Sequence, residues 1–138
     1  MATGSPFPPI NTEHGPIQTG QCNNSFIFPG VGLGVIASGA RRVTDSMFVA
    51  AARVLSEFAP MLHDPQAPLY PRLEQVRDIS FKVALAVARE AQRAGLTEVD
   101  LDTLEETVRL KMWTPHYFPL RRAVPERYRT DFDLVCRW

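Results

Sequence analysis

The fold of this 138-residue chain is decided by the stretch Gly20-Gln21-Cys22-Asn23-Asn24-Ser25-Phe26-Ile27-Phe28-Pro29-Gly30-Val31-Gly32-Leu33-Gly34. It combines side-chain amides, an aromatic and aliphatic run and closely spaced glycines, and it contains no charged residue. Soluble proteins rarely leave such a sequence on their surface. We therefore expect either that the stretch is buried or that its backbone and amides line a binding site.

Residues 1–24, on the N-terminal side, are rich in Pro, Gly, Thr and Asn. This composition predicts a short strand near residues 2–4, followed by a long loop. A loop of this length inside a compact domain is usually functional or depends on a neighbouring structure. We expect the strand to have no partner within the chain.

On the C-terminal side of the motif, Pro29 favours the start of a helix, and residues 31–38 are predicted to form a short helix. Gly32 and Gly34 weaken a helix by about 1 kcal/mol each. Their presence predicts that another backbone or a ligand packs closely against this helix.

Helical spacing of apolar residues predicts three further helices, over residues 45–59, 72–94 and 103–112. Expected end signals are Thr44 as an N-cap, Gly95 as a C-cap, and Asp102 with Glu105 as a capping box. The predicted core stripe consists of Phe48, Leu55, Phe58, Val83 and Val87. The chain is thus expected to be mainly α-helical with one short strand.

Composition argues against several classes of protein. The 15 basic and 15 acidic residues balance to a net charge of zero, which argues against nucleic-acid binding. The uncharged run over residues 15–40 is broken by proline and glycine, so we expect no membrane span. No signal peptide is recognisable. We expect a cytoplasmic protein, or one directed elsewhere by a segment that this sequence lacks.

Cysteine and histidine usage predicts neither a disulfide framework nor a metal site. Cys22 and Cys136 lie far apart in sequence and are predicted to be free thiols. We interpret Cys22 as a small buried apolar residue, the alternative being a reactive thiol beside a site. The histidines His14, His63 and His116 are spread along the chain and are not expected to be ligands.

Several motifs, in order, resemble the C-terminal part of the malic enzymes, and most closely the bacterial NAD type. They are Thr3-Gly4-Ser5-Pro6-Phe7, the stretch over 20–34, Gly39-Ala40-Arg41-Arg42-Val43-Thr44-Asp45, Leu69-Tyr70-Pro71, and Trp113 followed by Tyr117. The resemblance implies an α/β class, as the C-terminal part of a Rossmann-like NAD(P)-binding domain. It assigns residues 1–95 to that domain and residues 96–138 to a C-terminal helix and tail in subunit contact.

The resemblance also implies an activity, the oxidative decarboxylation of (S)-malate to pyruvate and CO₂ with reduction of NAD(P)⁺. NAD or NADP and Mg²⁺ or Mn²⁺ would be the cofactors. The family's catalytic Tyr and Lys, its metal ligands and its glycine-rich dinucleotide fingerprint are expected upstream, so this segment alone should be inactive. Expected partners are malate or pyruvate, the remainder of the enzyme chain and further copies in a homo-oligomer.

The resemblance assigns substrate binding to Asn24, with Asn23 close behind. An amide offers both donors and an acceptor without a charge. The alternative is that both asparagines cap the turn before Phe26. Ser5 and Gln21 are predicted to lie near the cofactor, with turn and loop roles as their alternatives. Many family members have glycine at the position of Cys22, which puts the fine geometry of this loop in question.

Other readings of the chain remain open. A malolactic enzyme would share the fold and cofactors but release lactate. A helical interaction protein from a truncated gene would retain the surface without catalysis. A mitochondrial location replaces the cytoplasmic one if the source is eukaryotic. The aromatic tail, with Trp113, Tyr117, Phe118, Tyr128, Phe132 and Trp138, is predicted to contact another subunit.

Overall fold

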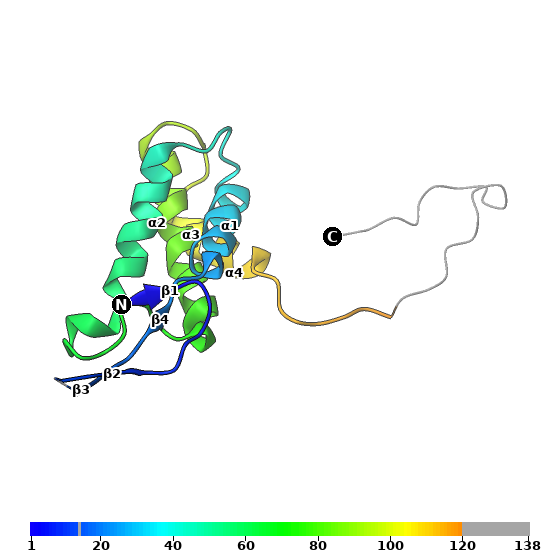
Figure 1. Cartoon of the computed structure of the whole chain (residues 1–138). Coiled ribbons are helices and arrows are strands. Elements are labelled where there is room, and N and C mark those ends of the chain that lie inside the picture. Colours follow the sequence, from blue (N-terminus) through cyan, green and yellow to red (C-terminus); the bar gives the residue numbers. More distant parts are fainter. Residues whose placement is uncertain (14, 120–138) are drawn as a thin grey trace, which may run out of the picture.

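The computed structural model describes residues 1–13 and 15–119 of the chain. The helices in this part are α1 (Phe28–Ser38), α2 (Asp45–Glu57), α3 (Val76–Arg93) and α4 (Leu104–Lys111). Short 3₁₀ turns lie at Asn24–Phe26, Pro60–Leu62, Leu73–Gln75 and Leu101–Thr103. Helices α1, α2 and α3 stand side by side, with the small strands grouped at one end (Figure 1). The expectation of a mainly helical chain is confirmed.

The expectation of one unpaired strand is wrong. Strand β1 (Ala2–Thr3) pairs in parallel with β4 (Gly20–Gln21), in the register Ala2 to Gly20 and Thr3 to Gln21. Between them, β2 (Ile10–Thr12) and β3 (Gly15–Ile17) form an antiparallel hairpin. The predicted loop therefore folds back on itself, and this return of the chain supplies β1 with its partner.

Helix α3 is the centre of the fold because it packs against α1, α2 and α4. Its apolar residues contribute to two clusters. One comprises Phe26, Val31, Met47, Ala51, Ile79, Val83, Val87, Ala91 and Leu96, and the other comprises Ala37, Ala84, Leu85, Ala88, Leu104 and Val108. Of the predicted core stripe, Val83 and Val87 are fully buried, and Leu55 and Phe58 pack against the first cluster.

Phe48 was predicted to be in the core, but its side chain is 41% exposed. Met47 and Ala51 are the buried residues of α2. The apolar residues at 47, 48, 51 and 52 allow more than one orientation of this helix. Its packing on α3 selects the orientation that leaves Phe48 on the outside.

Close contact between α1 and α3 depends on two glycines of the motif. A Cβ atom at Gly34 would lie 2.7 Å from the carbonyl oxygen of Ala84, and one at Gly30 would lie 2.6 Å from Cβ of Val83. Both positions are buried. The predicted close packing is confirmed for Gly34, whereas a Cβ atom at Gly32 would meet nothing of the described chain within 4 Å.

The helix ends agree only partly with the predicted caps. Gly95 has φ of 65°, and the Leu96 and Gly95 amides donate to the carbonyls of Ala91 and Gln92, a Schellman arrangement that ends α3. Thr44 precedes α2, but its hydroxyl pairs with that of Ser46 and makes no side-chain cap.

The predicted capping box is also wrong. Thr103 is the residue that precedes α4, and the Asp102 amide donates to the Asp100 carboxylate. Glu105 instead forms an ion pair with Arg109 one turn further along, at 2.8 Å. The 3₁₀ turn before α4 shifts the helix start and so removes the spacing that a capping box needs.

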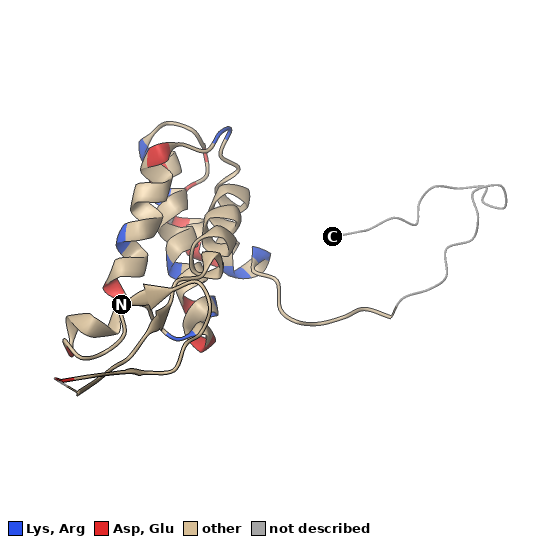
Figure 2. Ribbon diagram, viewed as in Figure 1, with Lys and Arg blue, Asp and Glu red and all other residues tan. Residues whose placement is uncertain are grey.

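The outer face of α1 is apolar and exposed. Phe28 is 56% exposed and Ile36 is 65% exposed. Figure 2 shows no acidic or basic residue anywhere along α1, whereas α2, α3 and α4 carry both kinds. None of the helices in the described ranges combines the length and apolar character that crossing a bilayer requires.

Candidate functional site

The candidate site lies where strands β1 and β4 end. The Gly20 amide donates to the Met1 carbonyl at 3.1 Å, and the Cys22 amide donates to the Thr3 carbonyl at 2.8 Å. Because the pair is parallel, both strands present their carboxyl ends at the same edge. In parallel sheets this edge is where ligands bind.

Two of the predicted site residues meet at this edge. Gln21 is the last residue of β4, and its Nε2 donates to the carbonyl of Gly4 at 3.3 Å. The Thr3 hydroxyl donates to the carbonyl of Ser5 at 2.7 Å, which bends the chain as it leaves β1. The structure therefore brings the Ser5 turn and Gln21 together, although they lie far apart in sequence.

The asparagine pair follows β4 directly and shows two different environments. The side-chain oxygen of Asn23 accepts a hydrogen bond from the Ser25 amide at 2.9 Å and so caps the turn at Asn24–Phe26. Asn24 is exposed, and its side-chain amide makes no hydrogen bond within the described chain. The capping alternative thus holds for Asn23 only, and the Asn24 amide is free to bind a ligand.

Tyr70 is the residue at this site that the sequence did not single out as functional. Its ring stacks on that of Phe26, with centroids 6.1 Å apart and planes inclined by 30°. A hydrogen bond with the Cys22 side chain raises the pKa of the Tyr70 hydroxyl, and partial burial raises it further. The one signal in the sequence was the motif Leu69-Tyr70-Pro71, which contributed to the family resemblance but did not indicate a function for Tyr70.

Cys22 is exposed, which corrects its interpretation as a buried residue. It directly follows β4, and its side chain lies close enough to the Tyr70 hydroxyl to raise the pKa of that group. This cysteine therefore belongs to the surroundings of the asparagine pair. Cys136 lies outside the described residues.

Two grooves are lined by residues that lie close to the asparagine pair in sequence. Gln21 lines one of them with Tyr70, Arg72 and Glu74. There the backbone, and next the Arg72 charge, hold the pKa of the exposed Glu74 carboxylate below its usual range. Ser25 lines the other groove, a mostly apolar one that also includes Phe28, Gly32, Ile36 and Trp113.

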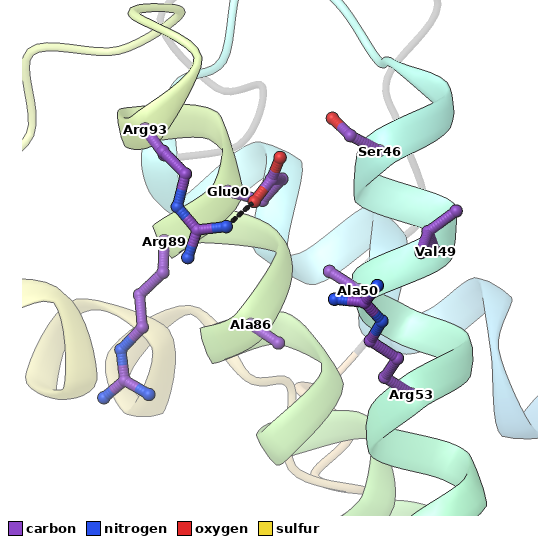
Figure 3. Close-up of a pocket in the computed structure, with 8 residues that line it drawn as sticks. All are labelled: Ser46, Val49, Ala50, Arg53, Ala86, Arg89, Glu90 and Arg93. Carbon is purple, nitrogen blue, oxygen red and sulfur yellow. Dashed lines mark hydrogen bonds and ion pairs between the residues drawn. The ribbon is translucent and has the colours of Figure 1, made fainter.

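A third groove, between α2 and α3, holds none of the predicted site residues (Figure 3). Glu90 already pairs with Arg93 at 2.8 Å, and Arg89 points away from α2. This arrangement offers no convergent set of donors for an anion. The edge where β1 and β4 end therefore remains the better candidate site.

The donor set at the strand edge suits a neutral or anionic polar group. Amide side chains can bind a carboxylate or a carboxamide without adding charge. Within residues 1–13 and 15–119, no group of three or more His, Cys, Asp or Glu residues is placed to hold a metal ion. His63 and His116 are exposed, and His14 lies outside the described residues.

Comparison with known proteins places this geometry in a family. The model of the malic enzyme NAD-binding domain matches residues 1–92. The NAD-dependent malic enzyme of Erwinia tasmaniensis is 45% identical over 124 residues, and that of Proteus mirabilis is 47% identical over the same length. Each match covers 89% of this chain but 22% of the relative. The chain thus spans about a fifth of the length of these curated relatives.

Solved structures give the same result. The malic enzyme of Entamoeba histolytica aligns with a TM-score of 0.61 and 27% identity, covering 80% of this chain and 21% of its own. The malic enzyme of Pyrococcus horikoshii aligns with a TM-score of 0.57 and 29% identity, covering 80% and 23%.

Proposed function

This chain belongs to the malic enzyme family, and from that premise we propose that it forms the substrate-facing end of an NAD-dependent malic enzyme. The complete enzyme would convert (S)-malate to pyruvate and CO₂ while reducing NAD⁺ or NADP⁺. The observation that carries the proposal is the shared strand edge, at which Ser5, Gln21, Asn23 and Asn24 leave β1 and β4 together.

Asn24 is the residue we assign to malate. Its exposed amide can donate to a substrate carboxylate, while the side-chain oxygen of Asn23 is occupied in shaping the turn. A hydrogen bond to a charged group contributes about 1.5–3 kcal/mol. Asn23 therefore acts mainly by holding Asn24 at the surface, and its remaining amide hydrogens can still reach the ligand.

Ser5 and Gln21 are assigned to the surroundings of the cofactor. Gln21 uses its amide nitrogen to hold Gly4, so its amide oxygen stays available to a carboxamide donor. Bound NAD or NADP would supply the hydride acceptor, and bound Mg²⁺ or Mn²⁺ would supply a Lewis acid. The remainder of the enzyme would hold most of both groups.

The remainder of the enzyme is also the partner we propose for the exposed face of α1. A helix that is apolar on all sides is normally buried, yet Phe28 and Ile36 lie open here. The parallel pair of β1 and β4 is equally incomplete, because parallel strands are usually covered on both faces. A larger sheet in the remainder of the enzyme would cover the apolar face of α1 and extend the pair of β1 and β4.

We assign residues 1–95 to the NAD-binding domain and residues 96–138 to a helix and tail that contact another subunit. Trp113, Tyr117 and Phe118 are all exposed, as an aromatic contact surface requires. Tyr128, Phe132 and Trp138 lie outside the described residues. The homo-oligomer and a cytoplasmic location, or a mitochondrial one in a eukaryote, belong to the same proposal.

The test begins with the native polypeptide, detected in its source cell with an antibody against residues 96–119. A band several times larger than 15.5 kDa supports the proposal. That polypeptide should form NADH or NADPH and pyruvate from malate in the presence of Mn²⁺. Lactate as the product would identify a malolactic enzyme instead. A band at 15.5 kDa would favour the interaction protein, for which the apolar face of α1 is the supporting observation.

A further inference from the structure

The residues on both sides of Asn23 and Asn24 contact one segment from a distant part of the chain. This segment, residues 68–71, follows α2 and precedes α3. We call it the strap. Strand β4 and the turn at Asn24–Phe26 lie against it, so the asparagine pair is bracketed by contacts to the strap.

The first contact lies on the N-terminal side of the asparagines. A Cβ atom at Gly20 would be 3.0 Å from the Tyr70 nitrogen, 3.4 Å from the Leu69 nitrogen and 3.5 Å from Cβ of Pro68. A methyl group at this position would therefore require the backbone of the strap to shift by a few tenths of an ångström. The strap therefore lies directly on β4, and glycine at position 20 permits this approach.

The second contact lies on the C-terminal side. Phe26 is fully buried, and the Tyr70 ring stacks on it at a centroid distance of 6.1 Å. Such aromatic pairs stabilise a contact beyond the apolar area that they bury.

From these contacts we propose that Tyr70 is a positioning residue. It holds the segment that carries Asn23 and Asn24 through Gly20 on the N-terminal side and Phe26 on the C-terminal side. It thereby fixes where the Asn24 side-chain amide meets the substrate. This inference rests on the proposed function of Asn24. Tyr70 itself touches the supports of the asparagines and acts through them. A displacement of about 1 Å at a positioned group can reduce turnover about 100-fold, so such supports matter for catalysis.

The kinetic test uses the full polypeptide that carries this chain. Tyr70→Ala removes the ring, and we expect KM for malate to rise about tenfold, with KM for the dinucleotide within about twofold of the wild type. Tyr70→Phe keeps the stacking on Phe26 and should restore most of the affinity. Leu62→Ala, which truncates an exposed side chain of the same connecting segment, is the matched control.

A double-mutant cycle separates positioning from a general structural role. If Tyr70 acts through Asn24, adding Tyr70→Ala to Asn24→Ala should cost less than about a twofold further loss in kcat/KM for malate. If the losses in kcat/KM of the two single variants instead multiplied in the double variant, the two residues would act independently and the proposal would be overturned. Gly20→Ala leaves the Tyr70 side chain in place but puts a Cβ atom 3.0 Å from the Tyr70 nitrogen, so the strap should shift and KM for malate should rise even if Tyr70→Ala fails to fold.

Hydrogen exchange in the 138-residue chain tests the inference without turnover. In Tyr70→Ala, peptides over residues 20–27 should lose protection, while peptides from α3 keep theirs. Unchanged exchange over residues 20–27 would overturn the positioning role of Tyr70. A full polypeptide that shows the exchange effect but no malate-dependent reduction of NAD⁺ would overturn the proposed function, while the contact of Tyr70 with the asparagine segment would stay supported.

Discussion

Two neighbouring asparagines perform different tasks at this strand edge. The side-chain oxygen of Asn23 accepts a hydrogen bond from the Ser25 amide and so forms a local cap, whereas the side-chain amide of Asn24 makes no hydrogen bond within the described chain. The difference arises from one turn of 3₁₀ helix, which directs the first side chain back to the Ser25 amide and the second outward.

This difference predicts opposite behaviour for two matched substitutions. Asn24→Ala should lower kcat/KM for malate about 10- to 100-fold in the full polypeptide, because a hydrogen bond to a charged substrate is lost. Its free energy of unfolding should stay unchanged. Asn23→Ala should lower the free energy of unfolding by about 1 kcal/mol, because a cap is lost. Steady-state kinetics measures kcat/KM for malate, and urea unfolding measures the free energy of unfolding. If both variants changed these two quantities by the same amounts, the assignment would be contradicted.

Tyr70 predicts how stability depends on alkaline pH. Its folded-state pKa is raised above the ordinary value of 10.0, first by the Cys22 side chain and then by burial. The folded protein therefore holds this proton more tightly than the unfolded chain does. The resulting stabilisation is complete below the unfolded pKa and is lost as pH rises through the folded pKa.

Urea unfolding between about pH 8 and pH 11 measures this effect on the wild type and on Tyr70→Phe. The wild type should lose stability above about pH 10 more steeply than the variant, which has no proton to lose at this position. Tyr117→Phe is the control, because Tyr117 is an exposed tyrosine. Identical pH dependence in the wild type and Tyr70→Phe would argue against a raised pKa.

At the scale of elements, the contact between α1 and α3 depends on which glycines of the motif face inward. Gly30 and Gly34 are one helical turn apart and lie against Val83, Ala84 and Val87. Gly32 is on the opposite side of the helix, with free space around it. The spacing of three glycines in sequence thus conceals two different structural roles.

Gly34→Ala and Gly32→Ala form a matched pair that tests this packing. Alanine favours a helix over glycine by about 1 kcal/mol, so Gly32→Ala should raise the free energy of unfolding. A methyl group at position 34 would lie 2.7 Å from the Ala84 carbonyl oxygen, and such overpacking costs about 1–3 kcal/mol. Gly34→Ala should therefore lower stability, and denaturant unfolding of both variants would show the opposite signs. A gain in both would mean that α1 lies further from α3.

At the scale of the whole molecule, the exposed face of α1 is the feature that most needs a partner. Phe28 and Ile36 lie open on a helix without any charge, beside a groove that is mostly apolar. Exposed apolar surface of this kind marks an interaction site. A parallel pair of two-residue strands at the end of the bundle has the same need for a larger sheet.

The 138-residue chain, purified alone, is therefore expected to self-associate and to show no malate-dependent reduction of NAD⁺. Ile36→Lys should shift it towards the monomer in sedimentation, because the charge interrupts the apolar face. Leu110→Lys, on the exposed side of α4, is the control and should have little effect. Sustained NADH formation by the isolated chain with malate and Mn²⁺ would contradict its role as one part of an enzyme.

Local features of the sequence determined the helices by themselves. The apolar spacing within residues 45–59, 72–94 and 103–112, the proline at position 29 and the glycine at position 95 act over a few residues, so their effects were predictable. The motif over residues 20–34 also identified the family and the asparagine pair. Phe48 was misplaced because a run of apolar residues does not specify which of two faces is buried.

Only the tertiary structure decided how the site is assembled. The pairing of β1 with β4, the contact of Gln21 with Gly4 and the stacking of Tyr70 on Phe26 all join distant parts of the chain. Such contacts leave no periodic pattern in the sequence, because they depend on where the packed helices bring the connecting segments. The sequence therefore identified Asn23 and Asn24 as candidates, whereas the tertiary contacts place them beside the shared edge of β1 and β4 and pack Tyr70 on the turn that follows them.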